Sequence, residues 1–256
     1  HVCQAQTVAA AALSSIVRWQ MDAVAELDSL LKRGLVADIF RMERAHSLLE
    51  AIGANAAQLN DRNNGNFGDL FGALQSSLVV DCLLSTARLF DRPNPRYPTR
   101  CMRYVVNFVG DHAAALPALR EPYQLGLALQ AAGLEATLGP YVAKGSSDFA
   151  MSLVAYYSAL LDNAATSATI EALKTIRDKA VAHNEHVESV TGPTWAEMRQ
   201  LVAHAKHFVG ILGWTWAGTA YAINGTFILT EDAMRPRHAF SRLLERLSNG
   251  KKNFAT

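Results

Sequence analysis

The stretch IRDKAVAHNEH, residues 176–186, is typical of the middle of a helix, yet it carries an arginine and a histidine that a simple amphipathic helix does not need. Arg177 and His183 are separated by five residues. On an ideal α-helix they lie about 120° apart around the axis and about 9 Å apart along it, so they do not share one face. Because the arginine side chain is long, both heads can reach one groove beside the helix, or a second copy of the helix can complete the set across a two-fold axis.

These two side chains suit the cleavage of an RNA phosphodiester bond. A histidine can remove the 2′-hydroxyl proton or protonate the leaving oxygen, and an arginine can stabilise the charged phosphorane through forked hydrogen bonds. Such a reaction requires neither a metal nor another cofactor. The structural alternative is that Arg177 pairs with a carboxylate such as Asp178 or Glu185 on a solvated helix, while His183 lies at the surface.

The rest of the chain predicts an all-α fold. Apolar residues recur at every third or fourth position and strand-like alternation is nearly absent. Gly34 is expected to break the first helix from the second, and Pro93 and its neighbours to end the third. The expected helices span 7–32, 36–59, 69–90, 99–115, 122–138 and 146–161, then one capped by 166–169 that holds Arg177, a long one led by Trp195 and a last one over 230–247, with a short extended piece at 224–229.

Composition bounds the partners and the compartment. The 256 residues are 50% hydrophobic, and 24 Lys and Arg against 23 Asp and Glu give a net charge of +1, so no whole-molecule field attracts nucleic acid or membrane. The three cysteines have no disulfide-framework spacing, which favours the cytoplasm. The uncharged run 208–230 is diluted by glycine and polar residues, which favours a buried core helix over a membrane span. We therefore expect no membrane partner.

An arginine-rich stretch offers a local patch for RNA. Five arginines fall within sixteen residues, among prolines and with two tyrosines nearby, and this mixture suits phosphates and unpaired bases. The alternative is that these arginines form salt bridges with carboxylates of the fold. The candidate RNA-binding residues are Arg88, Arg92, Arg96, Arg100 and Arg103.

Histidine spacing suggests a rival function. His183 and His186 are three residues apart, as are His204 and His207 on the next helix, and each pair can offer two nitrogens from one helical face. Two such helices can build a metal site in a bundle. No cysteine accompanies them, so we expect no metal or other cofactor and keep the His-ligated metal-binding bundle as an alternative.

Two sequence segments resemble a known family: IRDKAVAHNE, and STARLFDR at 85–92, about ninety residues upstream. Together they resemble the AbiU-type abortive-infection branch of the HEPN superfamily over about residues 20–190. The resemblance implies a helical bundle that forms a two-fold dimer, with a composite site at the interface and metal-independent endoribonuclease activity in phage defence or toxin–antitoxin systems. It places Arg177 and His183 at the motif's catalytic positions and Asp178 at its polar position.

The remaining expectations concern the domain organisation and the partners; the chain shows no internal repeat, low-complexity tract or clear linker. We expect a single helical domain over 1–256, with a HEPN-like core over about 20–190 and a C-terminal helical extension over about 193–256, and an antitoxin as a partner. The role of the segment after Phe208 stays open. Because members of such superfamilies can lose activity, the main alternative is a non-catalytic helical dimer that binds protein or RNA.

Overall fold

The structure, a computed structural model, describes residues 20–61, 67–94, 96, 99–182 and 192–252. These residues are helical apart from connecting loops and a small hairpin of β1 (Ala222–Ile223) and β2 (Thr226–Phe227), so the all-α prediction is confirmed. The α-helices are α2 (Val36–Ala54), α3 (Ala56–Leu59), α4 (Gly68–Leu89), α5 (Met102–Asp111), α6 (Pro122–Ala131), α7 (Glu135–Val142), α8 (Ser146–Asp162), α9 (Ala164–Ile176), α10 (Trp195–Leu212) and α11 (Thr230–Lys252). Wider π-helical turns occur at η1 (Leu31–Leu35), η3 (Arg177–Ala182) and η4 (Gly213–Ala217).

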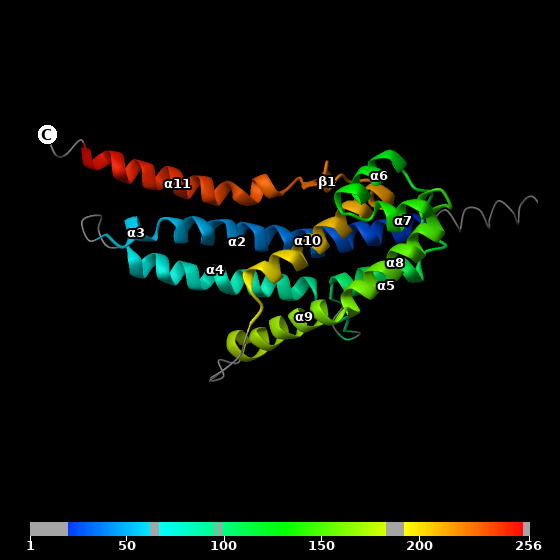
Figure 1. Ribbon diagram of the computed structural model, residues 1–256, viewed down its shortest axis with the longest axis horizontal. Helices are drawn as coiled ribbons and strands as arrows, with labels where there is room; N and C mark the ends of the chain where they lie inside the picture. Colours follow the sequence, from blue (N-terminus) through cyan, green and yellow to red (C-terminus); the bar gives the residue numbers. More distant parts are fainter. Residues whose placement is uncertain (1–19, 62–66, 95, 97–98, 183–191, 253–256) are drawn as a thin grey trace, which may run out of the picture.

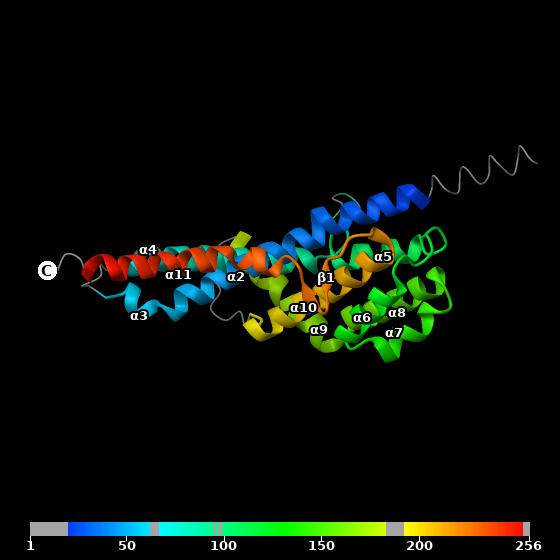
Figure 2. The ribbon, with the colours of Figure 1, turned by 90° about the horizontal axis from the view of Figure 1, so that it is seen from above.

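The molecule is elongated, with two differently built ends (Figure 1). Helices α11, α2 and α4 run side by side toward one end, while α5 to α8 gather at the other. Figure 2 shows the same division from above. At the three-helix end, the rings of Phe71 and Phe240 meet at 5.4 Å, edge to face, beside the buried Ile52. The main core lies at the other end and includes Phe149, Tyr157 and Phe208, each with 1% or less of its surface exposed.

The expected break at Gly34 is wrong. Residues 20–30, η1 and α2 form one continuous helical run through this glycine. A Cβ at position 34 would lie 2.4 Å from the Cβ of Arg100, so the glycine permits the chain near Arg100 to pack directly against the helix. A glycine inside a helix costs only about 1 kcal/mol, which this close packing outweighs.

Several other helix boundaries differ from the prediction. The helix expected over 122–138 is two helices, α6 and α7, because Gly133 takes a left-handed φ of 70° between them. Helix α9 starts at Ala164, capped by the Asn163 side chain, which accepts a hydrogen bond from the Ala165 amide; the expected cap at 166–169 is therefore wrong. Helix α4 matches the prediction within a residue, and the hairpin confirms an extended piece within 224–229. The expected first helix lies partly outside the described residues.

The helical part of the run 208–230, up to Trp216, is largely buried, as the sequence predicts. Phe208, Leu212 and Trp216 are 1% exposed or less, and the Trp216 indole nitrogen donates to Ser146 Oγ at 2.8 Å. Within the described ranges, a different helix is long and apolar enough to span a membrane by length and composition alone. That helix is α4, and 28% of its apolar window is buried inside the protein.

Candidate functional site

Arg177 stands where helix α9 changes from α-helical to π-helical hydrogen bonding, beside the end of α4. Its Nε donates to Asp178 Oδ1 at 2.8 Å, and its Nη1 donates to Asp91 Oδ2 at 3.0 Å. The side chain is 21% exposed. Two carboxylates, one from its own helix and one from the loop after α4, therefore fix the plane of the guanidinium.

The geometry leaves one edge of this guanidinium open. Within the part of the chain that the structure describes, the remaining nitrogen, Nη2, has no hydrogen-bond partner. The hydrogen bond to Asp178 raises the pKa of Arg177, and Asp91 acts in the same direction against the effect of burial. The group is thus a permanent, oriented cation with N–H donors to spare, which is the arrangement that binds a phosphate oxygen.

Asp91 is held as firmly as the arginine it pairs with. Its Oδ1 accepts a hydrogen bond from the Arg92 amide at 3.0 Å, while Oδ2 faces Arg177. The Arg92 side chain reaches across to Glu171 on α9, at 2.6 Å. Two ion pairs therefore join the end of α4 to α9. Through them the segment STARLFDR contacts the helix that carries the Arg177 motif.

The cavity that the described residues form beside Arg177 is small. The cavity between α4 and α9, lined by Phe90, Leu173 and Lys174 among others, has a volume of about 10 Å³. That volume is about that of one water molecule, and ligand sites are usually far larger clefts. This cavity is by itself too small to hold a nucleotide.

The other motif residues are only partly placed. His183 lies outside the described residues. Asp178 is half exposed and forms an ion pair with Arg177. This is the pairing that the structural alternative to catalysis predicted. Because residues Arg177–Ala182 form π-helical turns, the angle and rise expected for an ideal α-helix do not apply between Arg177 and His183. Turns of this kind are frequent at functional sites.

Three of the five arginines of the candidate RNA-binding stretch form ion pairs within the fold. Arg88 donates through Nε to the buried Asp38 at 3.0 Å, Arg92 pairs with Glu171, and Arg103 pairs with Asp162. These three link the stretch to three different helices, as the salt-bridge alternative predicted. Arg96 and Arg100 have exposed side chains.

The Asp38 pair shows what Arg88 does in the fold. Burial raises the pKa of Asp38, although Arg88 and Arg41 both act to lower it. Arg88 also donates to the buried Ser85 at 3.3 Å. Removal of Arg88 would leave a buried carboxylate with less compensation, so its contribution is to stability as well as to surface charge.

The alternative metal site is not assembled from the described residues. His204 and His207 line two different pockets, one between α9 and α10 and one between α6 and α10. Among the residues that the structure places, no three His, Cys, Asp or Glu side chains are grouped to hold a metal ion. His183 and His186 lie outside those residues.

The described residues form an all-α bundle that carries the Arg177 motif at the end of α9. A family model, HEPN AbiU2, matches residues 25–234. The chain therefore belongs to the AbiU2 family of the HEPN superfamily. The match extends into α11, so part of the expected C-terminal extension belongs to the family's common region. No curated protein and no solved structure gave a significant match.

Proposed function

We propose that this protein is a metal-independent endoribonuclease that acts in phage defence or as the toxin of a toxin–antitoxin pair. The observation that supports the proposal most is the state of Arg177: two carboxylates orient its guanidinium and Nη2 stays available. Membership of the HEPN superfamily supports an RNase or abortive-infection role in general. The direct test is to incubate the purified protein with a defined RNA in excess chelator and look for cleavage.

The proposed reaction is an attack by the 2′-hydroxyl of the RNA on the adjacent phosphate. His183 accepts the hydroxyl proton or, from a second copy of the chain, protonates the leaving 5′-oxygen. Arg177 neutralises the charge that develops on the phosphorane, using the N–H groups that Asp91 and Asp178 leave unused. Asp91 and Asp178 position the arginine, and we assign them no proton transfer. The products are a 2′,3′-cyclic phosphate and a 5′-hydroxyl.

We further propose that the site is completed by dimerisation, because the cavity that the described residues form beside Arg177 is small. A two-fold dimer would bring two copies of the motif helix together and supply both an acid and a base. Light scattering should therefore give about twice the 27.8 kDa mass of one chain. A mass of one chain at all accessible concentrations would contradict the composite site. A cytoplasmic location and an antitoxin that silences the enzyme complete the proposal.

Replacing Asp91 with alanine should lower RNA cleavage by roughly tenfold to a hundredfold, because the Arg177 guanidinium loses one of the two carboxylates that hold its plane. The loss should fall on kcat more than on KM. The matched control is Asp162→Ala, which removes a carboxylate that pairs with Arg103 instead, and it should retain activity. Faster cleavage by Asp91→Ala would instead mean that Asp91 competes with the phosphate.

A combined Arg96→Ala and Arg100→Ala change should weaken RNA binding. It should also reduce the slope of log K against log salt by the equivalent of roughly one to two phosphate contacts. The side chains of both arginines are exposed. Filter binding at several salt concentrations measures both quantities. Replacing Arg235 and Arg242, two arginines of α11, with alanine removes the same formal charge elsewhere. An equal loss in that control would show only a general charge effect.

A further inference from the structure

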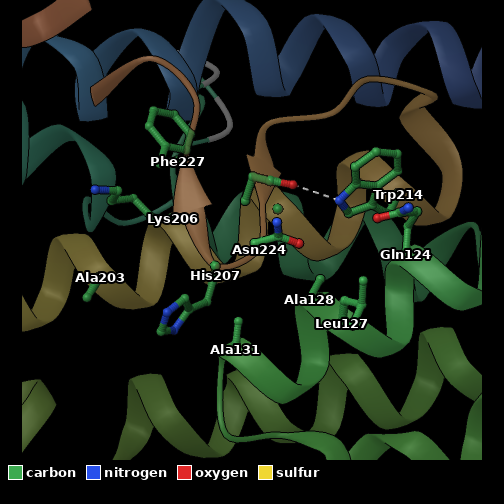
Figure 3. Close-up of a pocket in the computed structure, with 13 residues that line it drawn as sticks. Gln124, Leu127, Ala128, Ala131, Ala203, Lys206, His207, Trp214, Asn224 and Phe227 are labelled. Atoms are coloured by element: carbon green, nitrogen blue, oxygen red, sulfur yellow. Dashed lines mark hydrogen bonds between the residues drawn. The ribbon is translucent and has the colours of Figure 1, made fainter. Parts of the chain in front are cut away.

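The C-terminal hairpin, whose role the sequence leaves open, closes a pocket on α6 and α10 (Figure 3). The cavity has a volume of about 120 Å³, smaller than the 300–1,000 Å³ typical of sites for drug-sized ligands. Helix α6 forms one wall, α10 and Trp214 form the second, and the hairpin forms the third. A pocket of this size suits a single small ring system.

The hairpin is fixed in place before any ligand binds. The Trp214 indole nitrogen donates to the Ala222 carbonyl at 2.9 Å. The two turn residues, Asn224 and Gly225, have φ values of 49° and 76°, as a tight two-residue hairpin requires. A Cβ on Gly225 would lie 2.9 Å from the Cβ of Ala131, so the glycine allows the turn to rest directly on α6. The pocket is therefore preformed, and ligand binding would not have to order it.

The polar groups of the pocket are amides and an imidazole. Figure 3 shows the Asn224 amide near the middle, with His207 on one side and with Trp214 and Gln124 on the other. Each amide carries both a hydrogen-bond donor and an acceptor. Small alanine side chains of α6 and the aromatic rings of Trp214 and Phe227 provide the apolar surface. A ligand that fits must be partly apolar and must combine donors with acceptors along its edge.

The pocket does not favour an anion. Lys206 is the one basic Lys or Arg side chain among its lining residues, and its ammonium is engaged by Glu43 and by Thr230, the latter at 3.3 Å. The same ammonium lies 5.4 Å from the centre of the Phe227 ring, away from Asn224. Burial lowers the pKa of His207, so its imidazole is mainly neutral near neutral pH. The site thus offers neutral hydrogen-bonding groups rather than free positive charge.

We infer that this pocket binds one nucleobase. A nucleobase is planar, neutral and about one ring system in size, and side-chain amides read the donors and acceptors on its edge while apolar and aromatic groups cover its faces. The base can belong to an RNA strand or to a free nucleoside, since both present the same edge. This site is separate from Arg177 and does not depend on cleavage.

The test is an NMR titration of the Trp214 indole N–H signal, assigned by its loss in Trp214→Phe. The probes are the four free nucleosides and a short, uncleavable 2′-O-methyl oligonucleotide. At least one nucleoside or the oligonucleotide should shift the signal with saturation. Saturation by nucleosides alone identifies a free ligand, and saturation by the oligonucleotide alone identifies an RNA base. No saturable shift by any probe in the wild-type protein would overturn the inference.

Two variants test the residues that would read the base. Gln124→Ala and Asn224→Gly should each weaken binding by about tenfold, since each removes a side-chain amide that would hydrogen-bond the base; glycine at 224 keeps the turn geometry. The matched control is Gln130→Ala, an exposed amide of the same helix, which should bind as the wild type does. Equal losses in Gln124→Ala and Gln130→Ala would contradict base reading in the pocket. All of these measurements are independent of nuclease activity, so the two proposals can fail separately.

Discussion

Replacing His183 with alanine should reduce RNA cleavage by about a hundredfold or more, the usual consequence of losing a general acid–base group. The proposed reaction moves two protons, and in our proposal His183 is the side chain that moves them. Arg177→Lys should impair cleavage as well, because an ammonium is a point charge and cannot reproduce the planar fork that Asp91 and Asp178 orient. Initial rates on a defined RNA, with excess chelator throughout, measure both effects.

The control for His183→Ala is His204→Ala, which removes a partly buried histidine of the neighbouring helix α10 and should leave the rate within a few-fold of the wild type. Circular dichroism should give the wild-type helix content for the His183→Ala, Arg177→Lys and His204→Ala variants. Cleavage that is indifferent to His183→Ala would remove the motif from the chemistry. No cleavage by the wild-type protein would instead favour a non-catalytic helical module, in which the Arg177 ion pairs serve stability.

Trp216→Ala should cost roughly 3–5 kcal/mol of the free energy of unfolding, as expected for truncation of a fully buried aromatic residue. The Trp216 side chain is completely buried, its ring lies 6.1 Å from that of Phe149, and its indole nitrogen donates to Ser146 Oγ. It joins the segment after Phe208 to α8, so the C-terminal part and the central helices should lose stability together. Urea unfolding followed by circular dichroism gives the difference.

Two comparisons isolate the packing contribution of Trp216. Ser146→Ala removes the hydrogen-bond acceptor alone and should cost about 1 kcal/mol. Trp195→Ala truncates a partly exposed tryptophan that meets the His46 ring, and it should cost clearly less than Trp216→Ala. A loss below about 1 kcal/mol for Trp216→Ala would mean that the C-terminal segment does not belong to the main core.

Prolines predicted helix ends correctly where no tertiary contact changes their effect. The prolines after α4 end that helix where expected, and α10 begins at Trp195 as predicted. The prediction at Gly34 was wrong because a glycine can either end a helix or allow a close contact within one. The sequence does not show the contact with Arg100. The same ambiguity hid the division between α6 and α7 at Gly133.

The candidate site was harder to predict than the fold. Arg177 and Asp178 were singled out from one short stretch, but Asp91 was missed because it lies 86 residues away and no spacing rule connects them. The one available signal was that the phrase containing Asp91 and the phrase containing Arg177 occur together in the resemblance. The nucleobase pocket was missed for the same reason: its walls come from α6, α10 and the hairpin, and only the fold brings them together.

The measurement that tests the central claim most directly is the analysis of RNA ends produced by the purified wild-type protein in excess chelator. Our account predicts that cleavage persists without free metal and leaves a 2′,3′-cyclic phosphate on one fragment and a 5′-hydroxyl on the other. These ends follow from attack by the neighbouring 2′-hydroxyl, which needs only a base, an acid and a cation. Cleavage that stops when metal is removed, or that leaves a 3′-hydroxyl and a 5′-phosphate, would contradict it.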